Sequence, residues 1–579
     1  MPLLQFGEWR PDVADYGGQT THTIQNVIPR GDGYGPFPSL EELTQALPTP
    51  CRGAFLARNP SDGSVVIFAG TETRLYRLNN TTLAWDDISK GGSAYGDLDS
   101  DACWSFCQFG SRIMAAQRNA AMQTYVIGSS SEFDDVGGSA PAAGWVATLG
   151  SFVVACDING SPQDVGWCSI NNPLAWVATV SLADRQTLPD GGRTRCVAEI
   201  SNQVGIILQE GGVRRMVFAP GSAAVFQIEK IRTDFGILGP RSLTVAGGFG
   251  FFLSTKGVVQ MDAGGQCVFI GEERVDRTIL GQHLASAPQE IRSLAYDSGS
   301  PGLVFSVSDP KRNLWFLFYK TQGGVAGQFD RGFVYNWSLQ RWSTVAVSGE
   351  FVLQAAVPGL TLENLDALAP GAQTITGAAD NGGGKVRLTV GSTAGWTTGD
   401  VKTISAVTGT TEANGTWPIT VVDGTHIDLA TVAYANAYVS GGVVAGSIDA
   451  MTLSLDEISI AALNSIAAFS SAHKLAFFGS SPVEATLVTA ERSKEGRRVN
   501  INNHRPVTDA AEAYCTTLHR DNLRDELSEW PESLAMDADG NCPVLDEGRY
   551  VRVRMRIPAG VPWTFAAGVE TDVAEAGGF

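Results

Sequence analysis

One hairpin pattern, repeated along most of the chain, constrains the fold more than any other feature. Residues 65–85, VVIFAGTETRLYRLNNTTLAW, contain an apolar run, a turn, an alternating second run and a closing Trp85. This is the pattern of two antiparallel strands joined by a tight turn and anchored by an aromatic ring. Further copies, with different residues, lie at 113–126, 152–167, 204–218, 249–270, 314–342 and 475–488.

The spacing of these copies predicts the architecture. We count about seven units, with a range of roughly 6–8, most of them about 40 to 65 residues apart, a period typical of propeller blades and not of helical repeats. The inner strand of each unit is almost entirely apolar, as expected for a strand covered on both faces. The sequence therefore predicts an all-β fold, a β-propeller of about seven blades; an irregular β-sandwich with similar hairpins is the alternative.

Composition agrees with a turn-rich β protein. The chain has 579 residues, of which 66 are glycine and 17% are charged, and a propeller accommodates such a length by adding blades side by side. No stretch has some twenty unbroken apolar residues, and the first residues lack a basic flank and an apolar run, so neither a membrane span nor a secretory signal is predicted. Nine irregularly spaced cysteines without a C-x-x-C pair indicate reduced core thiols of a protein made in a cytoplasm.

Five segments are predicted from shifts in composition: an N-terminal arm, a first propeller part, an inserted small β-domain, a closing propeller part and a C-terminal platform segment, at 1–48, 49–357, 358–450, 451–492 and 493–579. Cysteine and methionine are absent from the insertion, where Asp423-Gly424 joins two alternating runs as in a tight hairpin. Two short helices are expected, one at Ser39 to Glu42 from a capping-box pattern and a charged one at 521–529.

The most asymmetric charge pattern is a strand near the C-terminus. Arg552, Arg554 and Arg556 alternate with apolar residues between 550 and 557, so the three guanidinium groups share one face. The face is either a solvated surface paired with local acids such as Asp546 and Glu547, or a contact with another subunit or with DNA. The net charge of −19 argues against a protein that wraps nucleic acid.

No catalytic or metal-binding motif is found. The chain lacks G-x-S-x-G, H-E-x-x-H and Walker sequences, and its six histidines are scattered. The loop at 537–541 begins like a calcium loop but has Cys542 in place of the required glycine. Tryptophans near the hairpin ends are expected to wedge adjacent blades together, with sugar stacking as the alternative. The sequence thus predicts no enzyme, no cofactor and no metal.

Phrases at both ends of the chain resemble a known family. FGEWRPDVADYGG, NVIPRGDGYGPFPSL, VVIFAGTETRLYRLN and SINNPLAW, together with GRYVRVRMRIPAGVPWTFAAGVETDVAEAGG near the end, resemble the tail nozzle (tail tubular protein B-like) proteins of short-tailed bacteriophages. The insertion, with GTTEANGTWPITVVDGTHIDL, looks like a small β-module found in many phage structural proteins.

The resemblance implies a structural virion protein. It implies a tail nozzle or hub subunit that forms a hexameric ring. This ring would lie below the portal and adaptor proteins and near the tail fibres. Double-stranded DNA would pass through its lumen without sequence recognition, toward the host outer surface on infection. The protein would be made in the host cytoplasm and reside in the virion tail. A receptor-binding or glycan-depolymerising propeller of the phage tail is the alternative.

The terminal segments are the expected contacts between subunits, because a closed propeller leaves only short, protected edges. Both segments are rich in aromatic residues, which anchor interfaces. The candidate interface residues are Trp9, Tyr34, Phe37, Trp530, Arg552, Arg554, Arg556 and Trp563.

Overall fold

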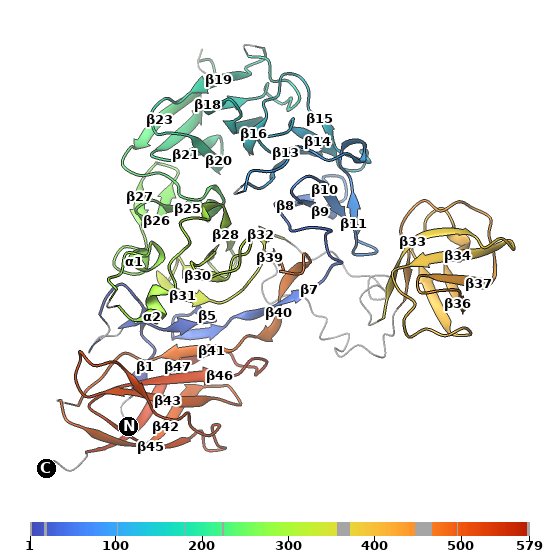
Figure 1. The fold of residues 1–579 in the computed structure, drawn as a ribbon. Coiled ribbons are helices and arrows are strands. Elements are labelled where there is room, and N and C mark those ends of the chain that lie inside the picture. The colour runs from blue at the N-terminus through green and yellow to red at the C-terminus, as the bar shows by residue number, and fades with distance from the viewer. Residues whose placement is uncertain are drawn as a thin grey trace.

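The computed structural model describes residues 3–14, 16, 20–100, 102–178, 180–222, 225–285, 287–355, 371–445, 466–494 and 496–575, and within these the regular structure is almost entirely β-strand. The helical elements are single turns: α1 (Asp276–Ile279), α2 (Gln289–Arg292) and the 3-10 turns η1 (Lys90–Gly92), η2 (Pro240–Ser242), η3 (Pro301–Leu303) and η4 (Thr411–Ala413). No helix in these ranges is long and apolar enough to cross a membrane. The structure is an all-β fold made of many small sheets (Figure 1).

Five separate four-stranded antiparallel sheets follow one another along the chain. The first has β8 (Ala54–Arg58), β9 (Val65–Gly70), β10 (Leu75–Leu78) and β11 (Trp85–Asp87), and the second has β12 (Ser105–Phe109), β13 (Arg112–Ala116), β14 (Gln123–Val126) and β15 (Asp134–Asp135). The third has β16 (Ala143–Leu149), β17 (Phe152–Ile158), β18 (Ser161–Trp167) and β19 (Asp184–Thr187). The fourth has β20 (Thr194–Ser201), β21 (Val204–Gln209), β22 (Val213–Phe218) and β23 (Phe226–Arg232), and the fifth has β24 (Thr244–Ala246), β25 (Phe249–Ser254), β26 (Gly257–Asp262) and β27 (Cys267–Phe269).

Two further four-stranded units continue the series. One is the start of a nine-stranded sheet and has β28 (Val304–Asp309), β29 (Leu314–Tyr319), β30 (Arg331–Asn336) and β31 (Arg341–Val345). The other is a separate sheet of β32 (Phe351–Gln354), β39 (Ile466–Phe469), β40 (Leu475–Pro482) and β7 (Pro38–Glu42), so a strand from the N-terminal region completes it.

The first strands of these units contact one another in a cycle. Strand β8 contacts β12, and the contacts proceed through β16, β20, β24, β28 and β32 back to β8. The cores lie between neighbouring units: Trp104, fully buried, packs with Phe68 of one sheet and Ile113 of the next. Trp167, Trp315 and Trp342 are buried in the same way, so these rings wedge between sheets and are closed to stacking on a sugar.

Strand β7 replaces the helix predicted at Ser39 to Glu42. Leu40 lies opposite Phe478 in the ladder with β40. The carboxylate of Glu42 accepts a hydrogen bond from Ser470 at 2.7 Å and lies 3.1 Å from Lys474 Nζ. The local capping-box pattern was wrong as a helix predictor because pairing with a distant strand satisfies the backbone groups that a helix would have satisfied internally.

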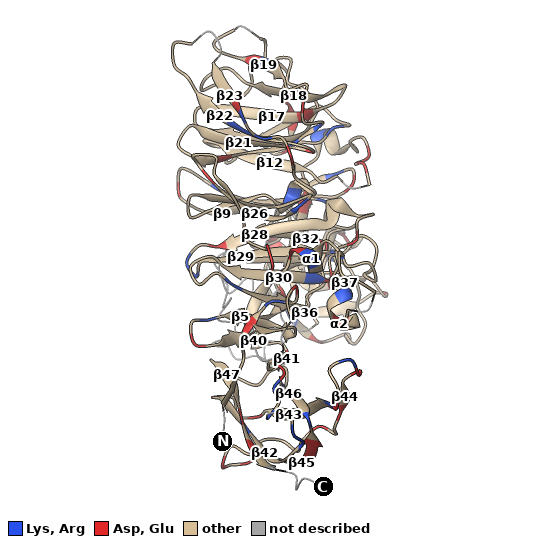
Figure 2. Cartoon of the chain, turned by 90° about the vertical axis from the view of Figure 1, so that its left-hand side faces the viewer, with Lys and Arg blue, Asp and Glu red and all other residues tan. Residues whose placement is uncertain are grey.

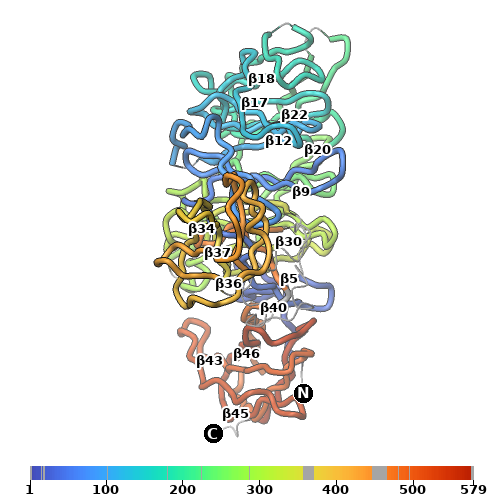
Figure 3. Tube along the Cα trace, turned by 90° about the vertical axis from the view of Figure 1, so that its right-hand side faces the viewer, coloured from blue at the N-terminus to red at the C-terminus, as the bar shows by residue number. Residues whose placement is uncertain are grey.

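The insertion contains a closed barrel with its own core. Its strands are β33 (Gln373–Asp380), β34 (Lys385–Val390), β35 (Val401–Ser405), β36 (Gly415–Val421), β37 (His426–Ala433) and β38 (Val443–Val444), in the order β33-β34-β37-β36-β35-β38. The Asp423-Gly424 turn lies between β36 and β37, whose residues Val421 and Ile427 face each other. Figure 3 shows the barrel in front of the ring of sheets, with the C-terminal strands below.

Both ends of the chain build one platform below the ring. Its six-stranded sheet has β45 (Cys542–Gly548), β42 (Val499–Thr508), β47 (Ala566–Glu575), β6 (Tyr34–Pro36) and β5 (Val27–Pro29), with β1 (Leu3–Gln5) also paired to β47. The nine-stranded sheet runs on from β31 through β4 (Ile24–Gln25), β41 (Ala485–Val488), β46 (Tyr550–Ile557), β43 (Tyr514–Arg520) and β44 (Ser528–Glu529). A parallel pair, β2 (Glu8–Trp9) and β3 (Thr20–Thr21), completes the N-terminal region.

The described residues of the predicted N-terminal arm therefore pack along the rest of the same chain. They contribute strands to the platform, to the nine-stranded sheet and to the sheet that β7 completes. The helix predicted at 521–529 is also absent: this stretch holds turns and β44, with Asp525 accepting hydrogen bonds from the Asn522 main chain and side chain. Figure 2 shows the ring and platform stacked along the molecule, with basic and acidic residues along its whole length.

All nine cysteines are free thiols, and seven of them are buried. Burial raises the pKa of most of these thiols, to about 12 for Cys107, because it disfavours the charged thiolate. Cys103 lies before β12 and Cys107 within it, in the packed region between sheets, in agreement with core thiols.

Candidate functional site

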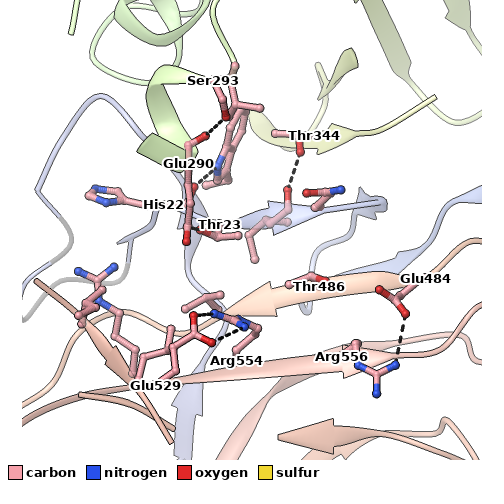
Figure 4. A pocket seen from close by; sticks show the side chains of 18 of the residues that line it. His22, Thr23, Glu290, Ser293, Thr344, Glu484, Thr486, Glu529, Arg554 and Arg556 are labelled. Atoms are coloured by element: carbon pink, nitrogen blue, oxygen red, sulfur yellow. Dashed lines mark hydrogen bonds and ion pairs between the residues drawn. The ribbon is translucent and has the colours of Figure 1, made fainter. Parts of the chain in front are cut away.

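A cavity of about 540 Å³ lies between the ring and the platform, and the predicted arginine row lines it (Figure 4). Its walls come from β4, from α2, from the ends of β30 and β31, and from the platform strands β41, β43, β44 and β46. Segments far apart in the sequence therefore meet here, at a boundary between the ring and the platform that we call the joint.

The arginine row is held by intrachain acids. Arg556 donates through Nε and Nη2 to the two carboxylate oxygens of Glu532, both at 2.8 Å, and its Nη1 lies 3.3 Å from Glu484. Arg554 pairs with Glu529, with one contact at 3.2 Å. These bidentate pairs are stronger than single contacts between exposed charges. The bond to Glu532 raises the pKa of Arg556, and in turn the pKa of Glu532 is lowered by Arg556.

Arg552 belongs to a more deeply buried pair. Its Nη2 lies 3.8 Å from Glu491, whose side chain is fully buried and also accepts from Arg520 Nε at 2.7 Å. The guanidinium of Arg556 additionally lies over the Tyr514 ring, 4.4 Å from its centroid. Each arginine of the row thus has an acidic partner within the chain, as expected for the first alternative, a face paired with acids of the same chain.

The acids predicted as partners of the row, Asp546 and Glu547, are engaged elsewhere. Asp546 accepts a hydrogen bond from Thr517, and Glu547 lies 2.9 Å from Arg498. This part of the prediction was wrong because adjacency in sequence puts both residues on β45, in the other platform sheet. The actual partners are Glu484, just before β41, Glu491, just after it, and Glu529 and Glu532 in and after β44.

The ring side of the cavity adds one acid and one arginine. Thr23 donates to Glu290 of α2 at 3.1 Å. Arg331 lies at the start of β30, and its Nε and Nη1 have no hydrogen-bond partner although both atoms are buried. With Arg552, Arg554 and Arg556 the lining holds four arginines, against four glutamates at 290, 484, 529 and 532. The formal charges of these eight groups cancel, so the lining of the cavity is balanced in charge and is not a surface of one sign.

The lining offers no catalytic arrangement. Ser293 donates its hydroxyl to the Glu290 main-chain carbonyl at 2.9 Å, so no general base orients it. Across the described ranges, no group of three or more His, Cys, Asp or Glu side chains could hold a metal ion. The charge pairs named above join platform segments to one another, and the contact toward the ring side is the hydrogen bond from Thr23 to Glu290.

The aromatic residues predicted at an interface are largely internal. Trp9, Tyr34 and Phe37 are fully buried, and Trp563 is 5% exposed. Trp9 donates its Nε1 to the His22 carbonyl at 2.8 Å and packs edge-on against Phe333, while Tyr34 donates to the Gly7 carbonyl at 2.8 Å. These rings serve the chain's own core, which corrects their assignment as exposed anchors.

Trp530 is the exception among the predicted aromatic residues. It is partly exposed, stacks on His519 with ring centroids 5.2 Å apart, and donates to the Glu547 carbonyl at 3.0 Å. It lies beside β44 at an edge of the platform, so a neighbouring molecule could reach it.

Sequence reasoning missed Glu290, Arg331, Glu484, Glu529 and Glu532. The one available signal was E-W-P-E at 529–532, a pair of glutamates that follows a region expected to lie near the arginine strand. The other residues come from elements whose proximity only the folded topology creates.

No family model matches this chain, and no curated protein matches it. Solved structures match at low similarity. They include the extracellular domain of BT4673 from B. thetaiotaomicron (10% identity, TM-score 0.29, covering 67% of this chain and 45% of that one). They also include U3-55K (8%, 0.31, 71% and 100%) and YCF48 bound to D1 peptide (13%, 0.30, 56% and 91%). At these TM-scores the likenesses carry no argument about function.

Proposed function

We propose that this chain is a structural virion protein, the tail nozzle subunit of a short-tailed bacteriophage. The observation that carries the proposal is the meeting of the two chain ends in one sheet outside the ring. The phrases that resemble nozzle proteins lie mainly at these ends, and β1, β5 and β6 pair with the sheet that contains β42, β45 and β47. A single platform built from the two segments that resemble nozzle proteins is suited to contact neighbouring proteins in a phage tail.

The proposal includes a propeller of seven blades. The six separate four-stranded sheets and the β28–β31 unit support that number, as does the cyclic contact of their first strands. Completion of the last unit by β7 is a further support, because pairing the N-terminal region with the C-terminal part of the ring holds a propeller closed. Each blade then protects the edges of the next.

The proposed role is mechanical and not catalytic. A conduit must let DNA slide, and an acidic subunit with a net charge of −19 repels the phosphate backbone. The nine-stranded sheet that runs from β28 in the ring to β44 in the platform supports a part that transmits load between the two. Portal, adaptor and fibre proteins are the proposed partners, and the tail of the virion is the proposed location.

Electron microscopy of the purified full chain tests the proposal. Particles are expected to form sixfold rings, and gold-labelled antibody against the chain is expected to mark the tail of virions. Trimeric spikes that shorten host-surface polysaccharide would instead identify the receptor-binding or depolymerising alternative. Absence of label from virions would show that the chain is not a virion component.

A further inference from the structure

The axis of the ring contains two adjoining cavities. A chamber of about 190 Å³ is lined by the segments before β12, β14 and β20 and by residues of β16, β17, β20 and η2. A second cavity, of about 500 Å³, is lined mainly by the first strands β8, β20, β24, β28 and β32. Trp145 and Arg241 line both. The smaller chamber, which we call the arginine chamber, is polar, whereas the larger one is bordered by Phe55, Phe305 and Phe351 and other apolar side chains.

Arg241 carries an uncompensated charge between the two cavities. Its Nη2 donates to the main-chain carbonyls of Cys103 at 3.0 Å and Trp104 at 2.6 Å. Its guanidinium lies 4.8 Å from the Trp145 ring and 5.8 Å from the Phe351 ring. These contacts hold the group in place, but none of the ion pairs found among the described residues involves it. Burial lowers the pKa of Arg241, as expected for a cation without an acidic partner.

Three more arginines line the arginine chamber, and only one is fully neutralised. Arg193 holds Asp157 in a two-pronged pair, with Nη2 2.6 Å from Oδ2. Arg118 Nε lies 3.5 Å from the same carboxylate without a hydrogen bond, and its Nη1 lies 3.6 Å from Asp99. Arg195 lies 3.8 Å from an exposed glutamate, Glu210, outside the chamber.

The charge of the chamber is opposite to that of the protein. Among the described residues its lining has four arginines and two aspartates, and Glu210 outside the chamber pairs with Arg195, which leaves an excess of one positive charge in a chain of −19. Gly144 keeps this arrangement open, because a Cβ there would lie 2.4 Å from Asp157 Oδ2 and 3.1 Å from Arg118 Cγ. A volume of about 190 Å³ exceeds the roughly 30 Å³ that one water occupies in the liquid, so it admits an anion of several heavy atoms.

We propose that the arginine chamber binds a small oxyanion, either a phosphate or a dicarboxylate. Arg118, Arg195 and Arg241 would supply the donors, since guanidinium groups match the geometry of both kinds of oxygen pair. A negative charge there would balance Arg241, which has no acidic partner in the ion pairs of the described residues, and would approach the buried Nε of Arg118, which has no hydrogen-bond partner. The site is independent of the proposed nozzle role, because it requires only the single chain.

Calorimetric titration of the full chain at low ionic strength tests this site, with inorganic phosphate in one arm and succinate in the other. Sodium chloride at matched ionic strength serves as the reference for nonspecific ion effects. Saturable heat with phosphate alone identifies a phosphate site, with succinate alone a carboxylate site, and with both a general oxyanion site. No saturable binding of either anion up to about 10 mM overturns the proposal.

Two chamber variants and one control locate the binding. Arg118→Gln and Arg195→Gln are each expected to weaken binding by at least about tenfold, because each removes a charged donor. Arg185→Gln is the control: Arg185 pairs with Asp164 on the outer strands of the same ring, away from the axis. Equal weakening in all three variants, with unchanged circular dichroism, would place the anion elsewhere and contradict the proposal.

Discussion

At the scale of single residues, the buried carboxyl of Asp276 makes stability depend on pH. Its side chain accepts a hydrogen bond from the Val258 main chain at 2.9 Å, and burial, with smaller contributions from Asp12 and Glu272, raises the pKa of Asp276 to about 7. The unfolded chain releases this proton near pH 4, so the folded state binds one more proton between pH 4 and 7. Stability from this group is therefore present at low pH and is lost as the pH rises to about 7.

The change Asp276→Asn removes that dependence. The amide oxygen can still accept the hydrogen bond from the Val258 main chain, and the amide stays uncharged because it has no proton that titrates in this pH range. The variant is expected to lose less stability than the parent between pH 4 and 7, by up to about 4 kcal/mol, and to unfold at higher urea concentration at pH 8. Urea titrations at several pH values measure this, with the exposed Asp62→Asn as control. Parallel pH profiles for parent and Asp276→Asn would refute the assignment.

At the scale of elements, the barrel is expected to be removable. Gln354 of β32 lies directly opposite Ile466 of β39, so the two strands can be joined by a two-residue turn. Replacing residues 355–465 with Asn-Gly is expected to leave the rest of the chain soluble and its main thermal transition within a few degrees of the parent. Circular dichroism melts check this, with residues 371–445 expressed alone as the complementary fragment. Aggregation of the shortened chain would mean that the insertion supports the ring.

Local patterns predicted the strands better than they predicted partners. The apolar runs that became β9, β17 and β29, and the Asp423-Gly424 turn, depend on nearest neighbours and could be read directly. The helix predicted at Ser39 to Glu42 is absent because pairing with a distant strand, β40, determines the conformation of these residues. The common face of the arginine row was predicted from its alternation, but its glutamate partners depend on topology. Trp9, Tyr34 and Phe37 were misassigned because composition cannot distinguish a core ring from an interface ring.

At the scale of the whole molecule, net acidity is expected to dominate encounters with DNA. The arginine row is paired internally and its cavity is balanced, so no described part of the joint offsets the charge of −19. A fluorescent duplex at about 50 mM salt should show no anisotropy change with the full chain, and the same result is expected for the variant with Ser at positions 552, 554 and 556. A basic protein of similar size is the positive control. Salt-sensitive, saturable binding that disappears in the triple variant would show that the row contacts DNA.

The strand β7 has a consequence for the order in which the chain can mature during translation. Residues 38–42 leave the ribosome early, but their partner strand, β40, ends at Pro482. Before β40 is synthesised, its residues Phe477 and Phe478, both buried in the finished sheet, are absent. Strand β7 then lacks its partner strand. Contacts this far apart in sequence form slowly. Nascent chains that stop short of Pro482 should therefore remain protease-sensitive at their beginning, so quality control can recognise incomplete copies before they reach assembly.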